Sequence, residues 1–304
     1  MKKVIQLVKA ATKKADKPLL EKWFSEHECM ALPEVATTRY FTFADYRPRL
    51  HAFNQLHDWH KHYLHPCFPQ LLGLSQHISA LSHPHSPFSL IGLVHVGNEI
   101  RQYQPLNNDE LCLHCYFDKI TPHQYGVQVD ITINVSQGGQ HCQTSRSTYL
   151  YRLPSVDILS NRATSDPVPS SEKLLPLPEH SQLQFKPGIG RQYARISGDY
   201  NPIHLAKWSA RLAGFKDVMA HGMHVLAMAL SRLNHNWQLP IEQIAIASQF
   251  SRPVLLPSSL TLKSSALASD PPTPVHFDLT NPSAPRRKQS VMSGEIRKLS
   301  VAKS

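Results

Sequence analysis

The order of hydrophobic and polar positions predicts the same series of elements twice along the chain. In the second half, residues 219–237 are apolar on nearly every side, which is typical of a buried helix. Four segments with the two-residue alternation of strands follow, at 244–250, 259–266, 274–279 and 289–299. The first half has a helical segment at 68–81 and strands at 90–97, 111–117, 127–135 and 142–151. This order indicates a duplicated α+β unit in which an antiparallel sheet wraps a buried helix.

A proline-rich stretch separates the two series. Residues 154–182 contain five prolines among Ser, Asp and Glu and show no clear periodicity, which is typical of an extended linker. We therefore expect a first unit at 1–153 and a second unit at 183–304. The full length of 304 residues fits this division, because single domains mostly run about 100–200 residues.

Composition excludes a disordered chain and a membrane-spanning one. Hydrophobic residues make up 41% and charged residues 18%, as in ordinary globular proteins. The longest apolar stretch, at 88–94, is far shorter than the ~20 residues of a spanning helix. Residues 1–9 are basic, but polar residues interrupt them before a secretory core forms, so a surface helix or frayed start is expected. We expect a cytoplasmic protein.

The cysteines agree with a reducing compartment. There are five, an odd number spread thinly over the chain, which favours reduced thiols over a disulfide framework. Cys112 and Cys115 have the spacing of a chelating pair, but the alternation around them predicts a strand. Residues three apart on a strand point to opposite faces, so this pair is not expected to share a metal or redox site.

The charge balance suggests an anionic partner without identifying it. The 32 basic and 22 acidic residues give a net charge of +10. A surplus of this size suits nucleic acid, acidic lipid, a phosphorylated cofactor or an acidic carrier protein, and it equally suits solubility alone. The basic run 286–288 fits contact with phosphates or an acidic surface, although such a cluster in a hairpin loop is usually only solvated.

One stretch carries candidate chemistry. Asn201 before Pro202 predicts a helix N-terminus, with the helix running over 202–213 and Gly214 as its left-handed stop. Asp199 then lies on the loop just outside this helix and His204 in its first turn. A carboxylate and an imidazole placed in this way converge on one small volume, an arrangement suited to proton transfer.

The same residues also have structural explanations, and the pattern alone does not decide between a catalytic and a structural role. Asp199 also suits the side chain that closes an Asx-turn, and His204 also suits a helix histidine whose hydrogen bonds are satisfied. Ser197 and Gly198 suit turn formation, and Asn201 suits a structural cap.

A family resemblance changes the weight of these alternatives. Ser197-Gly198-Asp199-Tyr200-Asn201-Pro202-Ile203-His204 resembles the signature of MaoC-like (R)-specific enoyl-CoA hydratases and dehydratases. Further matches cover most of residues 190–260: Ala210, Gly214-Phe215, the stretch 220–223 and the stretch 250–257. Residues 88–97 and 147–150 are more weakly similar to the degenerate first unit of double hot-dog members.

The resemblance implies a fold, a reaction and roles for residues. The fold is the double hot-dog, α+β, with two units that each wrap an antiparallel sheet around a long central helix. The reaction is reversible hydration of a trans-2-enoyl thioester to a (3R)-3-hydroxyacyl thioester. Asp199 and His204 match the catalytic pair that holds the water, and the backbone N–H of Gly222 matches the group that stabilises the thioester oxygen. Ser197, Asn201 and His221 match supporting positions.

The resemblance also sets expectations for partners and cofactors. The substrate handle is CoA or an acyl carrier protein; no cofactor, metal or nucleic acid is expected, and a homodimer stays open. The first unit contains no Asp-x-Asn-Pro-x-His segment, so we expect it to be catalytically silent and to help wall the acyl pocket. A non-catalytic acyl-thioester binding or scaffold protein is the alternative. A thioesterase on this fold is disfavoured because the histidine and hydratase-type spacing occur together. For Gly222, a role in tight packing alone also stays open.

The histidines elsewhere suggest a metal site only weakly. His57, His60, His62 and His65 are spaced so that three imidazoles could share one side of a helix. They lack a ligand set of recognisable spacing, and Lys61 between them would oppose a cation.

Overall fold

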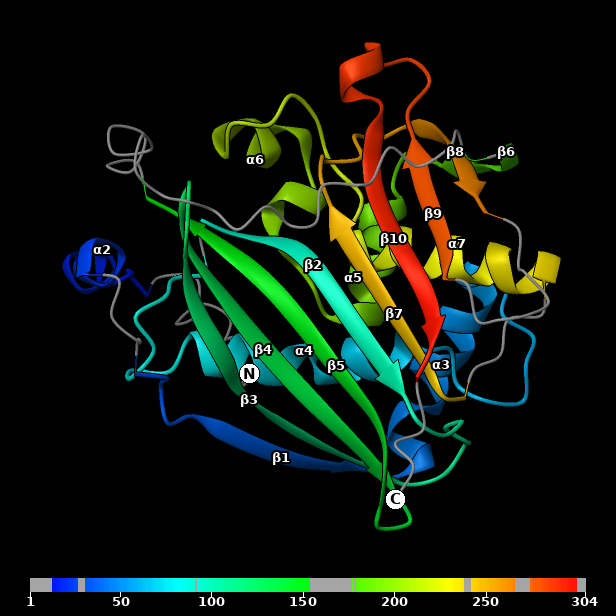
Figure 1. Cartoon of the computed structure of the whole chain (residues 1–304), viewed down its shortest axis with the longest axis horizontal. Coiled ribbons are helices and arrows are strands. Elements are labelled where there is room, and N and C mark those ends of the chain that lie inside the picture. The colour runs from blue at the N-terminus through cyan, green and yellow to red at the C-terminus, as the bar shows by residue number, and fades with distance from the viewer. Residues whose placement is uncertain are drawn as a thin grey trace.

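In the computed structural model, one antiparallel sheet extends through both halves of the chain (Figure 1). The residues it describes are 13–26, 31–90, 92–153, 177, 179–237, 242–265 and 274–299. The first half contributes β1 (Ala36–Phe41), β2 (Leu93–Gln102), β3 (Leu111–His123), β4 (Gly126–Gln137) and β5 (Gln140–Arg152). The second contributes β6 (Glu179–Phe185), β7 (Ile244–Phe250), β8 (Ser258–Ser264), β9 (Val275–Thr280) and β10 (Ser290–Lys298). The order across the sheet is β1-β3-β4-β5-β2-β7-β10-β9-β8-β6.

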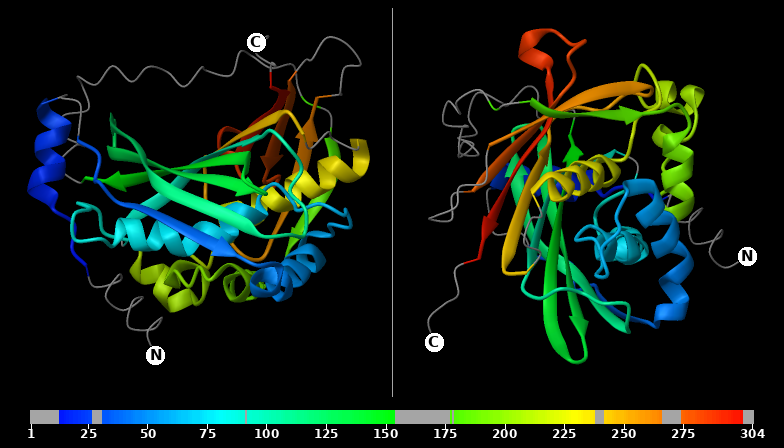
Figure 2. Two further views of the ribbon diagram at one scale, coloured as in Figure 1. Left: turned by 90° about the horizontal axis from the view of Figure 1, so that it is seen from below. Right: turned by 90° about the vertical axis from the view of Figure 1, so that its right-hand side faces the viewer.

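Helices α3, α4, α5 and α7 lie on one face of this sheet (Figure 2). The two central helices predicted from the sequence are α4 (Phe68–Leu81) and α7 (Gly222–Trp237), and both are rich in fully buried side chains. Further helices are α2 (Lys17–Glu26), α3 (Phe43–His57), α5 (Ile189–Ser197) and α6 (Lys207–Leu212), with short 3₁₀ turns η2 (Pro202–His204) and η3 (Arg286–Lys288). The predicted double hot-dog architecture is confirmed.

The two units meet where β2 pairs with β7. Their register runs from Gly97 opposite Gln249 to Gln102 opposite Ile244. At the centre of this seam Ile100 faces Ile246, and both are almost completely buried. Because the hydrogen bonds of the sheet cross this seam without interruption, the helices of the first unit are held in a fixed position against those of the second.

The prediction of one continuous helix over 202–213 is wrong, because this stretch is divided into η2 and α6. Asn201 does accept a hydrogen bond from Ile203 N, at 3.4 Å, but only the 3₁₀ turn η2 follows. The chain then extends at Ala206, with φ −145° and ψ 146°, before α6 begins. The hydroxyl of Ser209 donates to the carbonyls of Pro202 and Ala206 at 2.7 and 2.9 Å, in addition to the backbone N–H groups that these carbonyls accept, and so links the start of α6 to η2. Gly214 has the expected positive φ of 85°.

The predicted linker lies mostly outside the described residues, but its end does not. Strand β6 begins at Glu179, so the expected boundary between 182 and 183 falls inside a strand. Strands β1 and β6 and helices α3 and α5 were not predicted. β1 exposes most of its side chains and lies at the sheet edge, where the two-residue hydrophobic alternation is lost.

Several smaller predictions can be compared with the structure. On β3, Cys115 is buried and Cys112 is partly exposed, which confirms that they lie on opposite faces. The four described cysteines are free; Cys29 and the N-terminal residues 1–9 lie outside the described part. The basic run in η3 is exposed on the β9–β10 connection. No helix in the described ranges is long and apolar enough to cross a membrane.

The histidine cluster of the first unit does not share one side of a helix. Helix α3 ends at His57, and Asp58 adopts a left-handed conformation. His57 and His65 are buried, whereas His60 and His62 are exposed. The four imidazoles therefore do not form one metal site.

Buried histidines are a general feature of the interior. Six of them have pKa values lowered by burial: His57, His65, His77, His204, His221 and His224. The pKa falls to about 4 for His57 and to about 3 for His77 and His221. These imidazoles are neutral in the folded protein at neutral pH.

This burial predicts that the fold is sensitive to mild acid. Below the unfolded histidine pKa of about 6.5, the unfolded chain binds more protons than the folded one, so the free energy of unfolding falls as the pH falls. Each histidine that stays neutral in the fold contributes roughly 1.4 kcal/mol per pH unit. Urea unfolding measured from pH 7.5 to 5 is expected to show this decrease, and a constant unfolding free energy would contradict it. His57→Asn is expected to reduce the slope, whereas His60→Asn, at an exposed position, is expected to leave it unchanged.

Candidate active site

Asp199 lies on the short loop between α5 and η2. Helix α5 ends at Gly198, which has a φ of 82° and donates its N–H to Ala194 O at 2.8 Å. Asp199 N then donates to Ser197 Oγ at 3.1 Å, and Asn201 N donates to Asp199 Oδ1 at 3.1 Å. The side chain of Asp199 therefore does close a turn through one oxygen. Its second oxygen, Oδ2, faces the interior of the site, 3.8 Å from His221 Nε2.

His204 is buried on the other side of the loop, in η2. Its Nδ1 lies 2.9 Å from Met219 O and donates to that carbonyl, so Nε2 is the unprotonated nitrogen of the neutral ring. The backbone of α5 packs directly against it, because a Cβ at Gly190 would collide with the carbonyl oxygen of His204. This close contact explains the glycine within α5.

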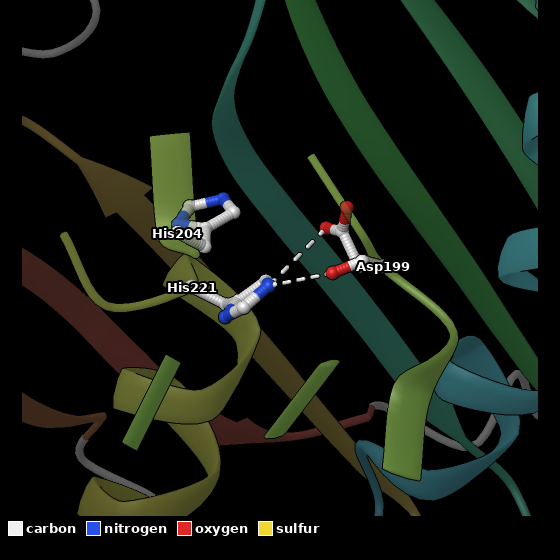
Figure 3. A group of neighbouring side chains, drawn as sticks. All are labelled: Asp199, His204 and His221. Carbon is white, nitrogen blue, oxygen red and sulfur yellow. Dashed lines mark hydrogen bonds and ion pairs between the residues drawn. The ribbon is translucent and has the colours of Figure 1, made fainter. Parts of the chain in front are cut away.

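His221 joins the other two groups. Its ring stacks on that of His204 with centroids 3.7 Å apart, and its Nε2 donates to the backbone oxygen of Asp199 at 3.1 Å (Figure 3). The second nitrogen, Nδ1, lies on the far side of the ring and has no hydrogen-bond partner among the described residues. The structure therefore brings together Asp199, His204 and His221, whose nearest donor atoms all lie within 4.8 Å of one another.

Burial keeps both imidazoles neutral. Desolvation is the largest influence on His204 and lowers its pKa, while the charge of Asp199 and the hydrogen bond to Met219 raise it. Desolvation and then the neighbouring His204 lower the pKa of His221 to about 3. A neutral His204 with a free Nε2 can accept a proton, and the carboxylate beside it favours the charged ring that results.

The three side chains could also hold a metal ion. Two imidazoles and a carboxylate are common ligands for first-row metals. The nitrogen of His221 that faces Asp199 is Nε2, which already donates to Asp199 O (Figure 3). Metal binding through this atom would replace that hydrogen bond.

Gly222 is the first residue of α7, where backbone N–H groups lack partners within the helix and the positive end of the helix dipole lies. Three carbons of the Phe250 ring lie 3.3 Å from where a Cβ of residue 222 would stand. A side chain at this position would therefore press against Phe250 by a few tenths of an ångström. This contact supports the packing alternative and leaves its N–H role as a proposal.

The first unit contributes residues that sequence reasoning missed. His95 on β2 and Tyr149 on β5 are opposite each other in the sheet, and their rings stack with centroids 4.8 Å apart. His77 Nδ1 lies 2.9 Å from the Tyr149 hydroxyl, and the ring of His95 meets the edge of Phe250 at 5.0 Å. Burial is the largest influence on both pKa values: it lowers that of His95 and raises that of Tyr149. The charge of Asp199 has a smaller influence and raises both pKa values. These residues belong to no motif, and only tertiary contact places them near Asp199.

A pocket of about 290 Å³ lies beside His204. Arg191 and Lys207 supply positive charge to its wall, and Lys207 forms a 2.6 Å ion pair with Asp217. This is a surface at which an anionic group could approach the site.

Part of the chain is similar in sequence to known proteins. Residues 178–283 match the family model of the MaoC like domain. This part of the chain is therefore similar to MaoC-like domains. Over 177 residues the chain is 31% identical to 3-hydroxyacyl-thioester dehydratase X of Mycobacterium tuberculosis. This alignment covers 58% of the chain and spans 60% of the length of that relative.

Solved structures extend the similarity of fold beyond the MaoC-like domain. HtdX of Mycobacterium tuberculosis superposes with a TM-score of 0.70 at 22% identity, covering 87% of this chain and all of that one. A MaoC-like dehydratase of Phytophthora capsici gives a TM-score of 0.67 at 15% identity, covering 91% and 99%. A Mycobacterium tuberculosis protein described as a double hotdog fold gives 0.50 at 12%, covering 87% and 97%. Both units therefore follow the double hot-dog fold.

The electrostatics of the site predict the effect of removing the carboxylate. In Asp199→Asn, the pKa of His204 is expected to fall further below its ordinary value, because the charge that opposes desolvation is lost. An NMR titration of the imidazole nitrogens measures this shift. Asp217→Asn is the control, since Asp217 is not among the groups that shift the pKa of His204. An unchanged or raised His204 pKa in Asp199→Asn would contradict the assignment.

Proposed function

We propose that this protein is a hydro-lyase that interconverts (3R)-3-hydroxyacyl thioesters and trans-2-enoyl thioesters plus water. The observation that carries the proposal is the placement of the Asp199 carboxylate beside a neutral, buried His204. The names of the matching domain and of the dehydratase relative support the same class of reaction.

The geometry suits a single water held by both groups. A carboxylate oxygen of Asp199 and a ring nitrogen of His204 lie within 4.8 Å of each other. One water can bridge that distance with two hydrogen bonds of about 2.8 Å. In hydration, the water oxygen bonds to C3 of the enoyl thioester as one proton leaves it, and a proton is delivered to C2. Dehydration reverses both transfers. Asp199 and His204 interact closely, so we assign these proton transfers to the pair rather than to either residue alone.

The thioester oxygen becomes negative as the C2 carbanion forms. We assign its stabilisation to the backbone N–H of Gly222 at the start of α7, where the helix dipole also favours negative charge. This chemistry requires no metal, because the thioester itself polarises the reacting carbon.

We also propose that only the second unit is catalytic, and that the first unit walls the acyl pocket through β2 and β5. The thioester handle is CoA or an acyl carrier protein, and the positive pocket beside His204 is compatible with the phosphate of either. The alternative is an acyl-thioester binding protein without turnover. The turn closed by Asp199 and the close packing of Gly222 against Phe250 give this alternative some support.

Turnover of enoyl thioesters tests the proposal. Wild-type protein is expected to remove the absorbance of crotonyl-CoA or of longer trans-2-enoyl-CoAs and to give a (3R) product. Asp199→Asn and His204→Ala are each expected to lower kcat about 10²- to 10⁴-fold, the usual contribution of general acid–base catalysis. In Asp199→Asn the new side-chain amide oxygen can still accept the turn hydrogen bond from Asn201 N, so folding should persist.

Asp58→Asn serves as the carboxylate control and is expected to retain activity, because Asp58 is exposed and does not line the pocket beside His204. EDTA is expected to have no effect. Loss of activity in EDTA would favour a metal at the same three side chains. Absence of turnover with both CoA and carrier-protein esters would favour the binding protein.

A further inference from the structure

One cation of the first unit reaches across to the second at the residues just before Asp199. Arg49 lies on α3, and its Nε donates to Ile196 O at 2.8 Å. Its Nη2 donates to Ser197 O at 3.1 Å and to Leu71 O at 3.2 Å. Ile196 and Ser197 are the last two residues of α5, whereas Leu71 belongs to α4. The guanidinium therefore connects two helices of the first unit to the end of a helix in the second.

The end of α5 needs such a donor. The last carbonyls of a helix have no partners within it and carry the negative end of the helix dipole. The planar guanidinium can donate to several acceptors in a fixed geometry, and it stays charged inside proteins. Burial lowers the pKa of Arg49, so the cation has lost much of its contact with water, and the hydrogen bonds to these carbonyls replace it.

A short chain of contacts leads from Arg49 to the backbone of Asp199. Arg49 holds the carbonyl of Ser197, and the hydroxyl of Ser197 accepts from Asp199 N at 3.1 Å. On the other side of the loop, His221 Nε2 donates to Asp199 O at 3.1 Å. The backbone of Asp199 is thus fixed from the first unit on one side and by His221, just before α7, on the other.

We propose that Arg49 is a positioning residue that sets the place of Asp199 relative to His204. This inference rests on the proposed function for its effect on rate. The first unit has no catalytic motif of its own, yet through Arg49 it determines the geometry of the pair in the second unit.

Loss of the guanidinium tests this role. A displacement of about 1 Å at a reacting group costs on the order of 100-fold in rate, so Arg49→Met is expected to lower kcat about 10- to 100-fold with little change in KM. Arg49→Lys is expected to fall between Arg49→Met and wild type, because an ammonium keeps the charge but lacks the planar fork. Arg47→Met is the matched control: Arg47 lies on the same helix and is exposed.

A second measurement separates positioning from a merely structural effect. The charge of Asp199 raises the pKa of His204 in the wild type. If Arg49→Met moves Asp199 away, the His204 pKa measured by NMR falls towards its value in Asp199→Asn. Loss of the Arg49 charge by itself would move the His204 pKa upward, so a downward shift identifies displacement of Asp199. In Arg49→Met combined with Asp199→Asn, no further fall is expected.

The outcomes are distinguishable from failure of the proposed function. If the wild type turns over no thioester, the proposed function fails, and the His204 titration still tests the positioning role. Wild-type kcat and wild-type His204 pKa in Arg49→Met would overturn the role of Arg49. A lower melting temperature with an unchanged kcat and His204 pKa would also overturn it. If Arg49→Met does not fold, Arg49→Lys decides by the same two readouts.

Discussion

The pairing of β2 with β7 is the contact on which the rest of the arrangement depends. The sheet's hydrogen bonds pass from one unit to the other through six opposed residue pairs. This places α3 and α4 beside α5 and α7, so that side chains from both units meet away from the sheet. His57 illustrates the result: its Nδ1 donates to Phe53 O, and its Nε2 accepts from His224 Nδ1 at 2.9 Å. Such contacts require the two units to hold one fixed relation.

In the loop at Asp199, one oxygen of the side chain has a structural role and the other is placed for the chemical role proposed above. Oδ1 takes part in the turn, whereas Oδ2 faces His221. His204 divides its roles in the same way, with Nδ1 fixed by Met219 and Nε2 left unprotonated. The alternatives raised by the sequence were therefore not exclusive. A turn that uses half of a carboxylate orients the other half, and this reduces the reorganisation needed for proton transfer.

Much of the fold could be predicted because the buried side chains of its central helices and strands recur regularly along the sequence. The all-round apolar segments became α4 and α7, and the alternating segments became eight strands of the sheet. The edge strand β1 lacked that pattern, and β6 shows it only at its end, where Leu183 and Phe185 are buried. Helix α3 had a signal in Thr42 and Asp45, which form a capping box, but Pro48 three residues further on is atypical of a helix interior.

Some residues of the candidate site could be predicted from the sequence, and others could not. The local motif brought Asp199 and His204 together because both lie within six residues. Arg49, His95 and Tyr149 come from the other unit, and their nearness depends on the strand order across the seam. No spacing in the sequence carries that information. The break between η2 and α6 was missed for a different reason, since no proline or glycine marks the extended conformation at Ala206.

The seam also bears on what a shortened chain would do. A fragment that kept only the second unit, from the start of β6 to the end of β10, would leave the backbone of β7 as an open sheet edge, with its N–H and C=O groups ready to pair with another strand. The carbonyls of Ile196 and Ser197 would lose their cation at the same time. Such a fragment has a chemical reason to seek a second copy of itself, whereas the full chain carries its own edge partner. In this protein, duplication within one polypeptide takes the place of self-association at that edge.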